Sequence, residues 1–482
     1  MAVIHRFEEV HWKRMGILLN DVHSRLNPTE VASVRTPGSE DEVCAIVAEA
    51  RRTGARISVS GGRHSMGGQQ FGAGTIHVDC RGLQEVRAFD ADRGLLEIGA
   101  GALWPRIIDA TYEAQPGEVK RWGIRQKQTG ADDLTLAGAI SANAHGRGLN
   151  MQPIVDDIED VTVVTPAGDL VRASRSENPE LFSLVAGGYG LFGILVRATL
   201  RLGPRLKLRR LVDIVDIDDA MTAVGRKVDD GCLFGDFQYA IDPNDDSFLR
   251  RGVFTCYKPV PAETPISEAG ADLRREDWLG LLRLAHTNKP EAFRLYARHY
   301  LDTHGRIYWS DTMQRSTYIP TYAEFLAEAL GRESPESLMI TELYVPPEGV
   351  VPFMGRARAV LRATGVEDIY GTIRAIRRDT SSFLPWARGD WACVIFNLRT
   401  PHTPEGIDRS RRTARGLINA AADLGGSFFL AYHRWTTREL LLRCHPRLPE
   451  FLAAKRRLDP DDRLVSDWLR GIREILEPGA PA

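Results

Sequence analysis

The sequence predicts a two-lobed α+β protein, and three observations support this prediction. With 482 residues, the chain is too long to fold around one compact core. Residues 1–205 alternate short apolar strands with helical segments, whereas residues 206–435 have longer strands and more aromatic side chains. We therefore expect a first domain over 1–205, a second domain with a large antiparallel sheet over 206–435, and a segment over 436–482 that returns to the first domain.

The composition and net charge of the chain disfavour some classes of binding partner. The chain is 43% hydrophobic and 26% charged, with a formal net charge of -2. Because its basic residues are spread throughout, nucleic acids and anionic membrane surfaces are not expected partners. No apolar run approaches the roughly 18 residues that a membrane-spanning helix needs, and residues 1–19 lack a secretory signal pattern. We expect a cytoplasmic protein.

The cysteines do not form a metal or redox motif. They are dispersed and never form a C-x-x-C pair, which disfavours zinc ribbons and thioredoxin-like sites. The six positions are Cys44, Cys80, Cys232, Cys256, Cys393 and Cys444. We expect buried free thiols and no bound metal.

The clearest single element is a helix that begins after Ser39 and ends at Gly54. Ser39 and Glu42 form a capping-box pattern, and glycine is common where a helix ends. The apolar face consists of Val43, Ile46, Val47 and Ala50. Strands are predicted over residues 56–60, 75–80, 95–101, 159–166 and 170–174, and helices over 102–115 and from 178 onward. Residues 444–476 are also predicted to be helical, with a turn at Asp459–Pro460.

A glycine-rich loop follows the predicted strand 56–60 and contains His64. We compare three interpretations: a surface turn, a hydrolase nucleophile loop and a cradle for a phosphorylated cofactor. A hydrolase nucleophile needs G-x-S-x-G between a strand and a helix. Ser65 lacks the first glycine of that motif and no helical pattern follows it, so this interpretation is disfavoured.

A second glycine motif, G-x-G-x-x-G, lies at Gly188–Gly193. In a nicotinamide-binding fold this motif follows a strand and opens a helix, so that the pyrophosphate meets the helix N-terminus. Here the predicted helix comes first and the strand second. The match is therefore not a nicotinamide fingerprint, although it marks a close approach of the backbone.

The cofactor cradle is favoured because two such loops occur in the first domain. Glycine lacks a Cβ, adopts positive φ and lets backbone N–H groups converge on an anion. Residues 60–68 and 130–148 each combine small residues with one histidine, His64 and His145. A hydrogen-bonded loop histidine remains the alternative for His64, and a structural role remains open for His145.

The loop Ser60–Gln69 resembles the G-x-G-H-S-x-x-G-Q loop of the vanillyl-alcohol oxidase / p-cresol methylhydroxylase flavoprotein superfamily. The resemblance continues through residues 34–69, 136–148 and 181–200, and thus covers roughly residues 26–205. Arg63 departs from it, because the family usually has glycine before the histidine. The resemblance implies a PCMH-type FAD-binding domain of two subdomains, followed by an α/β substrate domain.

In this family the loop histidine bonds covalently to the flavin 8α-methyl, so the resemblance assigns that bond to His64. A second, cysteinyl bond is excluded because no cysteine lies between Cys80 and Cys232. The other residues that the resemblance places at the FAD are Ser60, Gly61, Gly62, Arg63, Ser65, Met66, Gly67, Gly68, Gln69, Gly130, Thr135, Gly138, Ala139, Ser141, His145, Gly146 and, through its backbone, Ile194.

Three segments of the second domain resemble substrate-site strands of the same superfamily. They are residues 339–348, 370–386 and 431–437, and their candidate catalytic residues are Glu342, Arg374 and His433. Thr372 stands where alditol oxidases carry an acid, and the lysine of the lactone-oxidase run is absent. A structural role is an equal alternative for each residue. The aromatic candidates for the substrate wall are Tyr318, Trp309 and Tyr432.

The resemblance implies an oxidoreductase that oxidises a CH–OH group of a small molecule, with hydride transfer to the His-linked flavin and reoxidation by O2 or another acceptor. The alternatives are oxidation of a CH–NH bond, as in cytokinin dehydrogenases, a non-catalytic flavin-binding protein, and a noncovalent FAD reductase that uses a nicotinamide. The substrate and the oligomeric state are left open.

Overall fold

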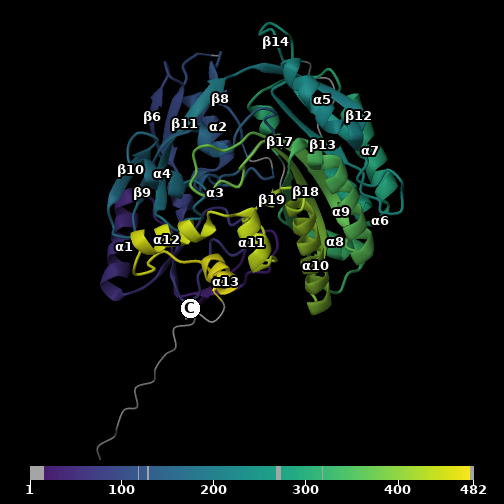
Figure 1. The fold of residues 1–482 in the computed structure, drawn as a ribbon. Helices are drawn as coiled ribbons and strands as arrows, with labels where there is room; N and C mark the ends of the chain where they lie inside the picture. Colours follow the sequence, from purple (N-terminus) through teal and green to yellow (C-terminus); the bar gives the residue numbers. More distant parts are fainter. Residues whose placement is uncertain (1–15, 118, 128–129, 267–272, 317–318, 478–482) are drawn as a thin grey trace, which may run out of the picture.

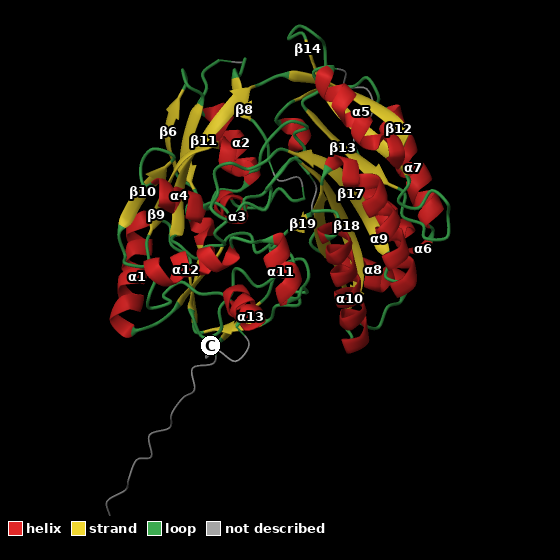
Figure 2. Cartoon of the chain, viewed as in Figure 1, coloured by secondary structure: helices red, strands yellow, loops and turns green. Residues whose placement is uncertain are grey.

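The computed structural model describes residues 16–117, 119–127, 130–266, 273–316 and 319–477. Two lobes lie side by side, the first in purple to blue and the second in teal to green (Figure 1). Both contain helices and sheets (Figure 2), which confirms the predicted α+β class. The yellow C-terminal helices return to the lower side of the first lobe.

The first lobe begins with a parallel sheet of three strands in the order β3-β5-β4. The elements of this part are β1 (Ile17–Leu19), β2 (Thr29–Val31), β3 (Ser33–Arg35), α1 (Glu40–Thr53), β4 (Ile57–Ser60), β5 (Ile76–Asp79) and the 3-10 turn η1 (Cys80–Gly82). The helix prediction is confirmed: the Ser39 side chain accepts from the backbone N–H of Glu42, and Gly54 adopts φ 74°. The four predicted apolar residues of α1 are buried against this sheet.

The rest of the first lobe is built on a six-stranded antiparallel sheet in the order β10-β9-β11-β7-β6, with β8 paired to β11. Its elements are β6 (Val86–Asp90), β7 (Leu95–Gly99), α2 (Trp104–Glu113), β8 (Trp122–Ile124), α3 (Leu136–Ala142), η2 (Ile154–Asp157), β9 (Ile158–Val164), β10 (Leu170–Ser174), α4 (Pro179–Val185) and β11 (Ile194–Pro204). Helix α4 precedes strand β11, so the predicted order around Gly188–Gly193 is confirmed.

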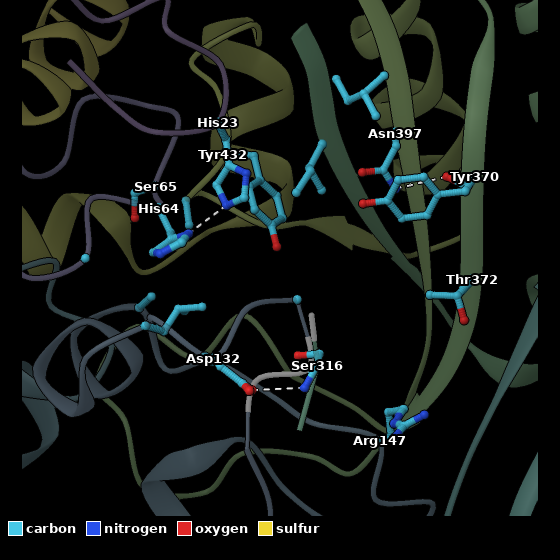
Figure 3. Close-up of a pocket in the computed structure, with 18 of the residues that line it drawn as sticks. His23, His64, Ser65, Asp132, Arg147, Ser316, Tyr370, Thr372, Asn397 and Tyr432 are labelled. Atoms are coloured by element: carbon cyan, nitrogen blue, oxygen red, sulfur yellow. Dashed lines mark hydrogen bonds between the residues drawn. The ribbon is translucent and has the colours of Figure 1, made fainter. Parts of the chain in front are cut away.

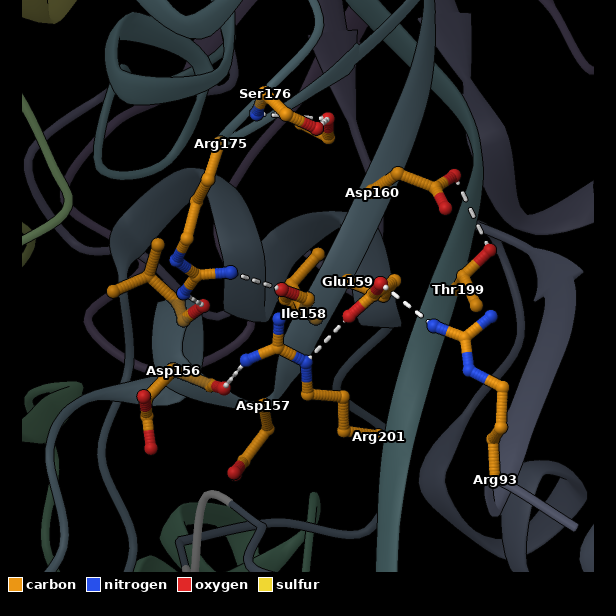
Figure 4. Close-up of polar contacts among 12 residues, drawn as sticks. Arg93, Asp156, Asp157, Ile158, Glu159, Asp160, Arg175, Ser176, Thr199 and Arg201 are labelled. Atoms are coloured by element: carbon orange, nitrogen blue, oxygen red, sulfur yellow. Dashed lines mark hydrogen bonds and ion pairs between the residues drawn. The ribbon is translucent and has the colours of Figure 1, made fainter.

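Polar contacts join neighbouring strands of this sheet (Figure 4). Glu159 on β9 accepts from Arg201 on β11 at 2.7 Å and from Arg93 at 3.1 Å. Arg175 donates to the carbonyl oxygens of Ile158 and Val155, both at 2.7 Å. Because each arginine reaches a different segment, these bonds fix the register of β9 and β11 around the buried core.

The second lobe is an antiparallel sheet of eight strands in the order β15-β12-β14-β13-β17-β18-β16-β19. Its strands are β12 (Lys207–Asp216), β13 (Phe234–Tyr239), β14 (Arg251–Val260), β15 (Ile307–Trp309), β16 (Glu336–Val345), β17 (Asp368–Ile376), β18 (Trp391–Pro401) and β19 (Ser427–Phe428). Its helical segments are α5 (Ile217–Asp229), α6 (Arg275–Thr287), α7 (Lys289–Asp302), η3 (Thr312–Gln314), α8 (Tyr322–Leu330), η4 (Pro347–Gly349), α9 (Val350–Thr364) and α10 (Pro404–Ala422). Helices α6 and α7 contact each other, with α6 against β17 and α7 against β12 and β14.

The C-terminal helices are α11 (Arg438–Cys444), α12 (Leu448–Leu458) and α13 (Asp467–Leu476). Leu464 forms a parallel bridge with Ile57 at the edge of the first-lobe sheet. The backbone N–H of Trp468 donates to the carbonyl oxygen of Gly68 at 3.2 Å, and Thr29 donates to the Asp467 carboxylate at 2.7 Å. Helix α13 therefore contacts the glycine-rich loop and helps to hold it in place.

None of the helices in the described part of the chain combines the length and apolar character needed to cross a bilayer. The six cysteines are free, and all but the partly exposed Cys44 are buried, as predicted.

Candidate cofactor and substrate site

A cavity of about 950 Å³ lies between the two lobes and is lined by both. Figure 3 shows His64, Ser65 and Asp132 of the first lobe across from Tyr370 and Thr372 of the second. The predicted site residues that line it are Ser60, Gly61, Gly62, Arg63, His64, Ser65, Gln69, Gly130, Thr135, Gly138, Ser141 and Arg374. The cavity thus brings together both predicted glycine loops and one predicted catalytic residue.

The two glycine loops touch each other, and this contact explains two of the glycines. A Cβ at Gly61 would overlap the Thr135 hydroxyl, and a Cβ at Gly62 would overlap the carbonyl oxygen of Asp133. Thr135 is itself fixed because its side chain caps α3 by accepting from the N–H of Gly138 at 3.1 Å. A side chain at either glycine would push the first glycine loop away from the second one.

Arg63 occupies a conformation that favours glycine. Its φ is 60°, in the left-handed region, which explains why related loops carry glycine at this position. Its side-chain Nε is buried and has no hydrogen-bond partner among the described residues.

The same loop presents free backbone donors to the cavity. Among the described residues, no acceptor receives the backbone N–H of Gly61, Gly62, Arg63 or Ser65. All four residues line the cavity. Backbone N–H groups without protein acceptors in the lining of a cavity suit an anionic group such as a phosphate.

His64 lies at the end of this loop with its side chain only 9% exposed. Its Nδ1 is 2.8 Å from Nε2 of His23, and its Nε2 is 3.3 Å from Oδ1 of Asp133. Burial and the neighbouring His64 lower the pKa of His23 to about 3, so His23 is neutral at physiological pH. Burial raises the pKa of Asp133, but the His64 imidazole more than offsets this and holds it below its ordinary value.

The second glycine segment is tied to the second lobe through Asp132. The Lys127 ammonium pairs with the Asp132 carboxylate and donates to the Ser316 hydroxyl at 3.0 Å. Asp132 also accepts from the Ser316 backbone N–H at 3.0 Å (Figure 3). This ion pair holds the cavity wall together where the two lobes meet.

Six of the residues expected at the cofactor, in addition to His145, are not part of the cavity lining. Met66 and Ala139 are buried in the core, and Ile194 is fully buried beside α1. Gly68, with φ 82°, packs against α13, while Gly67 and Gly146 contact the side chain of Gln69 and the backbone of Lys127, respectively. None of the six lines the cavity, because apolar packing and loop closure take up their positions.

His145 and Glu342 form a buried pair behind the wall rather than lining it. His145 Nε2 lies 2.9 Å from Glu342 Oε1, and the Tyr344 hydroxyl donates to the same carboxylate. The Cys393 thiol is 3.6 Å from His145 Nε2. Burial raises the pKa of Glu342, but His145, Tyr344 and Arg374 together bring it below the ordinary value, so the carboxylate is ionised.

Arg374 on β17 faces the cavity. Its Nε is buried without a hydrogen-bond partner among the described residues. Two residues earlier, Thr372 donates to Asp236 of β13 at 3.5 Å. A carboxylate of the neighbouring strand thus lies beside Thr372, and Asp236 also lines the cavity.

Of the remaining candidate substrate-site residues of the second lobe, one lines the cavity and the other described ones do not. Tyr432 lines the cavity, and burial beside Glu342 raises its pKa well above the ordinary value. His433 does not line it: its Nε2 lies 3.1 Å from the Thr341 hydroxyl, and burial lowers its pKa to about 4. Trp309 lies outside the wall beneath the guanidinium of Arg205, 3.9 Å from its ring centre. Tyr318 lies outside the described residues.

Comparison with known proteins agrees with this geometry. The FAD binding domain family matches residues 31–174, which include both β4 and the glycine loops. This part of the first lobe is therefore similar to FAD-binding domains.

Three relatives are similar to less than half of the chain. It is 31% identical over 207 residues to the uncharacterized oxidoreductase ORF5 in fasciation locus of Rhodococcoides fascians, covering 42% of this chain and 43% of the relative. It is 29% identical to the FAD-linked oxidoreductase srdI of Neurospora crassa, covering 40% and 36%. It is 30% identical to cytokinin dehydrogenase 5 of Oryza sativa subsp. japonica, covering 37% and 35%. The matches thus span less than half the length of each relative.

Five further residues belong to this site, and of these only Asp133 and Arg147 lie in the glycine segment 130–148 that the sequence singled out. His23 and Asp133 contact His64, while Arg147, Arg210 and Asp236 line the far side of the cavity. They come from a coil, a loop and two strands without a shared motif. Only the pairing of β12, β14 and β13 brings Arg210 and Asp236 to the same part of the cavity.

Proposed function

We propose that this protein is an FAD-dependent oxidoreductase that oxidises a CH–OH group of a small organic molecule. The observation that carries the proposal is the position of His64, which shares one cavity with Arg374 and Tyr432 of the opposite lobe. A flavin bound there would accept a hydride from the substrate carbon and later pass the electrons to O2 or another acceptor. Residues 1–205 together with 436–482 are assigned to the FAD domain, and residues 206–435 to the substrate domain.

The cofactor is assigned to the first-lobe wall. The unsatisfied N–H groups of Gly61, Gly62, Arg63 and Ser65 would hold the pyrophosphate, and His64 would form the covalent bond. Gly190 fits a close cofactor approach, because it lines the cavity with φ 76° and a Cβ there would meet no described atom within 4 Å.

The substrate hydroxyl is assigned to Tyr432 and Arg374. As hydride leaves the carbon, the hydroxyl proton passes to the Tyr432 oxygen, and the tyrosine proton passes to the ionised Glu342 beside it. The Arg374 guanidinium, whose Nε has no hydrogen-bond partner among the described residues, stabilises the negative charge that develops on the substrate oxygen. The substrate carbon ends as a carbonyl, and the proton ends on Glu342.

Oxidation of a CH–NH bond is the second candidate. It is favoured by the similarity to the cytokinin dehydrogenase of rice. The same cavity would then take an amine, and Asp236 would supply an anion near it.

Anaerobic reduction of the flavin-loaded protein separates the two candidates. Panels of alcohols, polyols and amines are mixed with the protein without oxygen, and the loss of visible flavin absorbance is followed. Bleaching by alcohols supports the proposal. Bleaching by amines alone assigns the CH–NH reaction, and no bleaching by either panel leaves a non-catalytic flavin protein.

Covalent attachment is tested by acid precipitation followed by peptide mass mapping. The wild-type pellet should stay yellow, with the flavin mass on the peptide that contains His64. The His64→Ala variant should release its flavin into the supernatant. His402→Gln is a suitable control, because His402 bonds Ser337 away from the cavity. Free flavin from the wild type would remove the covalent bond from the proposal.

A further inference from the structure

We propose that the part of the cavity lined by Arg147 and Arg210 binds a carboxylate of the substrate, whose apolar portion lies against helices α6 and α7. This inference rests on the proposed function and names the substrate class of the same site: a hydroxylated organic acid with an apolar body. The group defined by Arg147, Arg210 and Asp236 is called the arginine end below.

Arg210 is a half-buried cation that has no carboxylate partner among the described residues. Its guanidinium lies 4.4 Å from the ring centre of Tyr308, 5.3 Å from that of Tyr300 and 5.4 Å from that of Tyr257. It donates to the Tyr257 and Thr303 hydroxyls at 3.0 and 2.9 Å. These contacts orient the guanidinium but carry no negative charge, so its charge stays uncompensated at the cavity.

Arg147 is only weakly neutralised. Its Nη1 is 3.7 Å from Oδ1 of Asp236, longer than a hydrogen bond, and its Nη2 donates to the Met313 carbonyl at 3.0 Å. Its Nε is buried without a hydrogen-bond partner among the described residues. The arginine end therefore holds two guanidinium groups against one carboxylate, a net charge of +1 (two positive, one negative).

The charged side chains that line the cavity as a whole also favour an anionic ligand. Among the described residues that line the cavity, five are arginines (Arg63, Arg147, Arg210, Arg315 and Arg374) and two are aspartates (Asp132 and Asp236). Asp132 is already paired with Lys127 and Arg315 with Asp109, which leaves four arginines and one aspartate. The cavity therefore favours an anionic ligand over a cationic one. A carboxylate of the ligand would neutralise the net positive charge of the arginine end and leave no other charge unpaired there.

Apolar and aromatic side chains cover the adjoining wall. Leu281, Leu282 and Ala285 come from α6, and Phe293 and Tyr296 come from α7. Because these groups offer little hydrogen bonding, a fully hydroxylated polyol would lose its contacts with water there. The combination fits an acid with an aliphatic or aromatic body.

The test measures binding of matched acid and amide probes to the flavin-loaded protein by calorimetry. The probes are benzoate, phenylacetate and 3-phenylpropionate, each beside its uncharged amide. At least one acid should bind about tenfold more tightly than its amide, because the half-buried cations require an anion. In Arg210→Gln this preference should fall below about threefold, with the flavin content unchanged.

Arg209→Gln is the matched control. Arg209 is the exposed neighbour of Arg210 on β12 and does not line the cavity, so the preference for the acid should persist. Equal binding of every acid and its amide in the wild type, or no binding of any acid, overturns the inference. A preference that survives in both Arg210→Gln and Arg147→Gln overturns it as well. Loss of flavin reduction by every alcohol would instead refute the proposed function, whatever the calorimetry shows.

Discussion

Nδ1 of His64 lies 2.8 Å from Nε2 of His23, so two imidazoles 41 positions apart in the chain share one hydrogen bond at the cavity wall. One of the two nitrogens must donate and the other accept. Because the pKa of His23 is lowered to about 3, His23 is uncharged and able to accept the Nδ1 proton of His64. Such acceptance makes the imidazole of His64 a better nucleophile.

Replacement of His23 should therefore slow the attachment of flavin. We expect His23→Phe to bind FAD but to form the covalent bond at least about tenfold more slowly, in the range of general-base effects. Apoprotein is mixed with FAD, and acid-stable flavin in the precipitate is measured over time. His23→Gln, which keeps a hydrogen-bonding side chain, should recover part of the rate. Equal rates in wild type and His23→Phe would contradict the role assigned to His23.

Gly61→Ala should weaken FAD binding, because the added methyl group would overlap the Thr135 hydroxyl. Overpacking of this kind costs about 1–3 kcal/mol. We expect a lower flavin content after purification and a lower melting temperature. Gly38→Ala is the control, since a Cβ there meets no described atom within 4 Å and should leave both quantities unchanged. Full flavin content in Gly61→Ala would show that the two glycine loops can move apart without weakening FAD binding.

Arg374→Ala should slow flavin reduction by substrate about 10²-fold, a typical loss for a group that stabilises developing charge. Arg374→Lys should be intermediate, because it restores the charge without the planar guanidinium. The measurement is stopped-flow reduction without oxygen, with flavin content as the reference. An unchanged reduction rate in Arg374→Ala would place this guanidinium outside the reaction.

The stability of the protein should fall as the pH falls from about 6.5 towards 3. Burial lowers the pKa of His445 to about 3 and that of His433 to about 4, from an ordinary 6.5. Between those values the unfolded chain binds protons that the folded chain excludes, so the free energy of unfolding decreases by up to about 1.4 kcal/mol per pH unit for each histidine. Above about pH 7 this contribution no longer changes with pH.

His445→Phe removes one of these groups and should make the pH dependence shallower by about 1 kcal/mol per pH unit between pH 6 and pH 4. His445 packs edge-on against Phe428 at 4.9 Å, so an aromatic replacement suits the site. Urea unfolding followed by tryptophan fluorescence measures the effect. An identical slope in the variant and the wild type would show that His445 is protonated without unfolding.

Local patterns predicted the elements and the loop of the first lobe. Helix α1 begins and ends where Ser39 and Gly54 indicated, because caps and an apolar face act within one helix. The strand-to-loop junction before His64 follows equally from local apolar runs and glycines. These signals need no knowledge of distant residues.

The partners across the cavity could not be predicted in this way. Glu342 was expected at the cavity, but it is held behind the wall by His145, which lies 197 positions away. Asp236 lies beside Thr372 only because β13 pairs with β17. Such relationships depend on strand order and register, which a single sequence does not specify.

The contact between Gly68 and Trp468 has a consequence for biosynthesis. A ribosome makes the N-terminal lobe early, yet the rear support of its glycine loop is supplied by a helix that emerges almost four hundred residues later. The glycine loop therefore reaches its final shape only after both lobes and residues 467–476 have left the ribosome, so its folding depends on a late-synthesised partner.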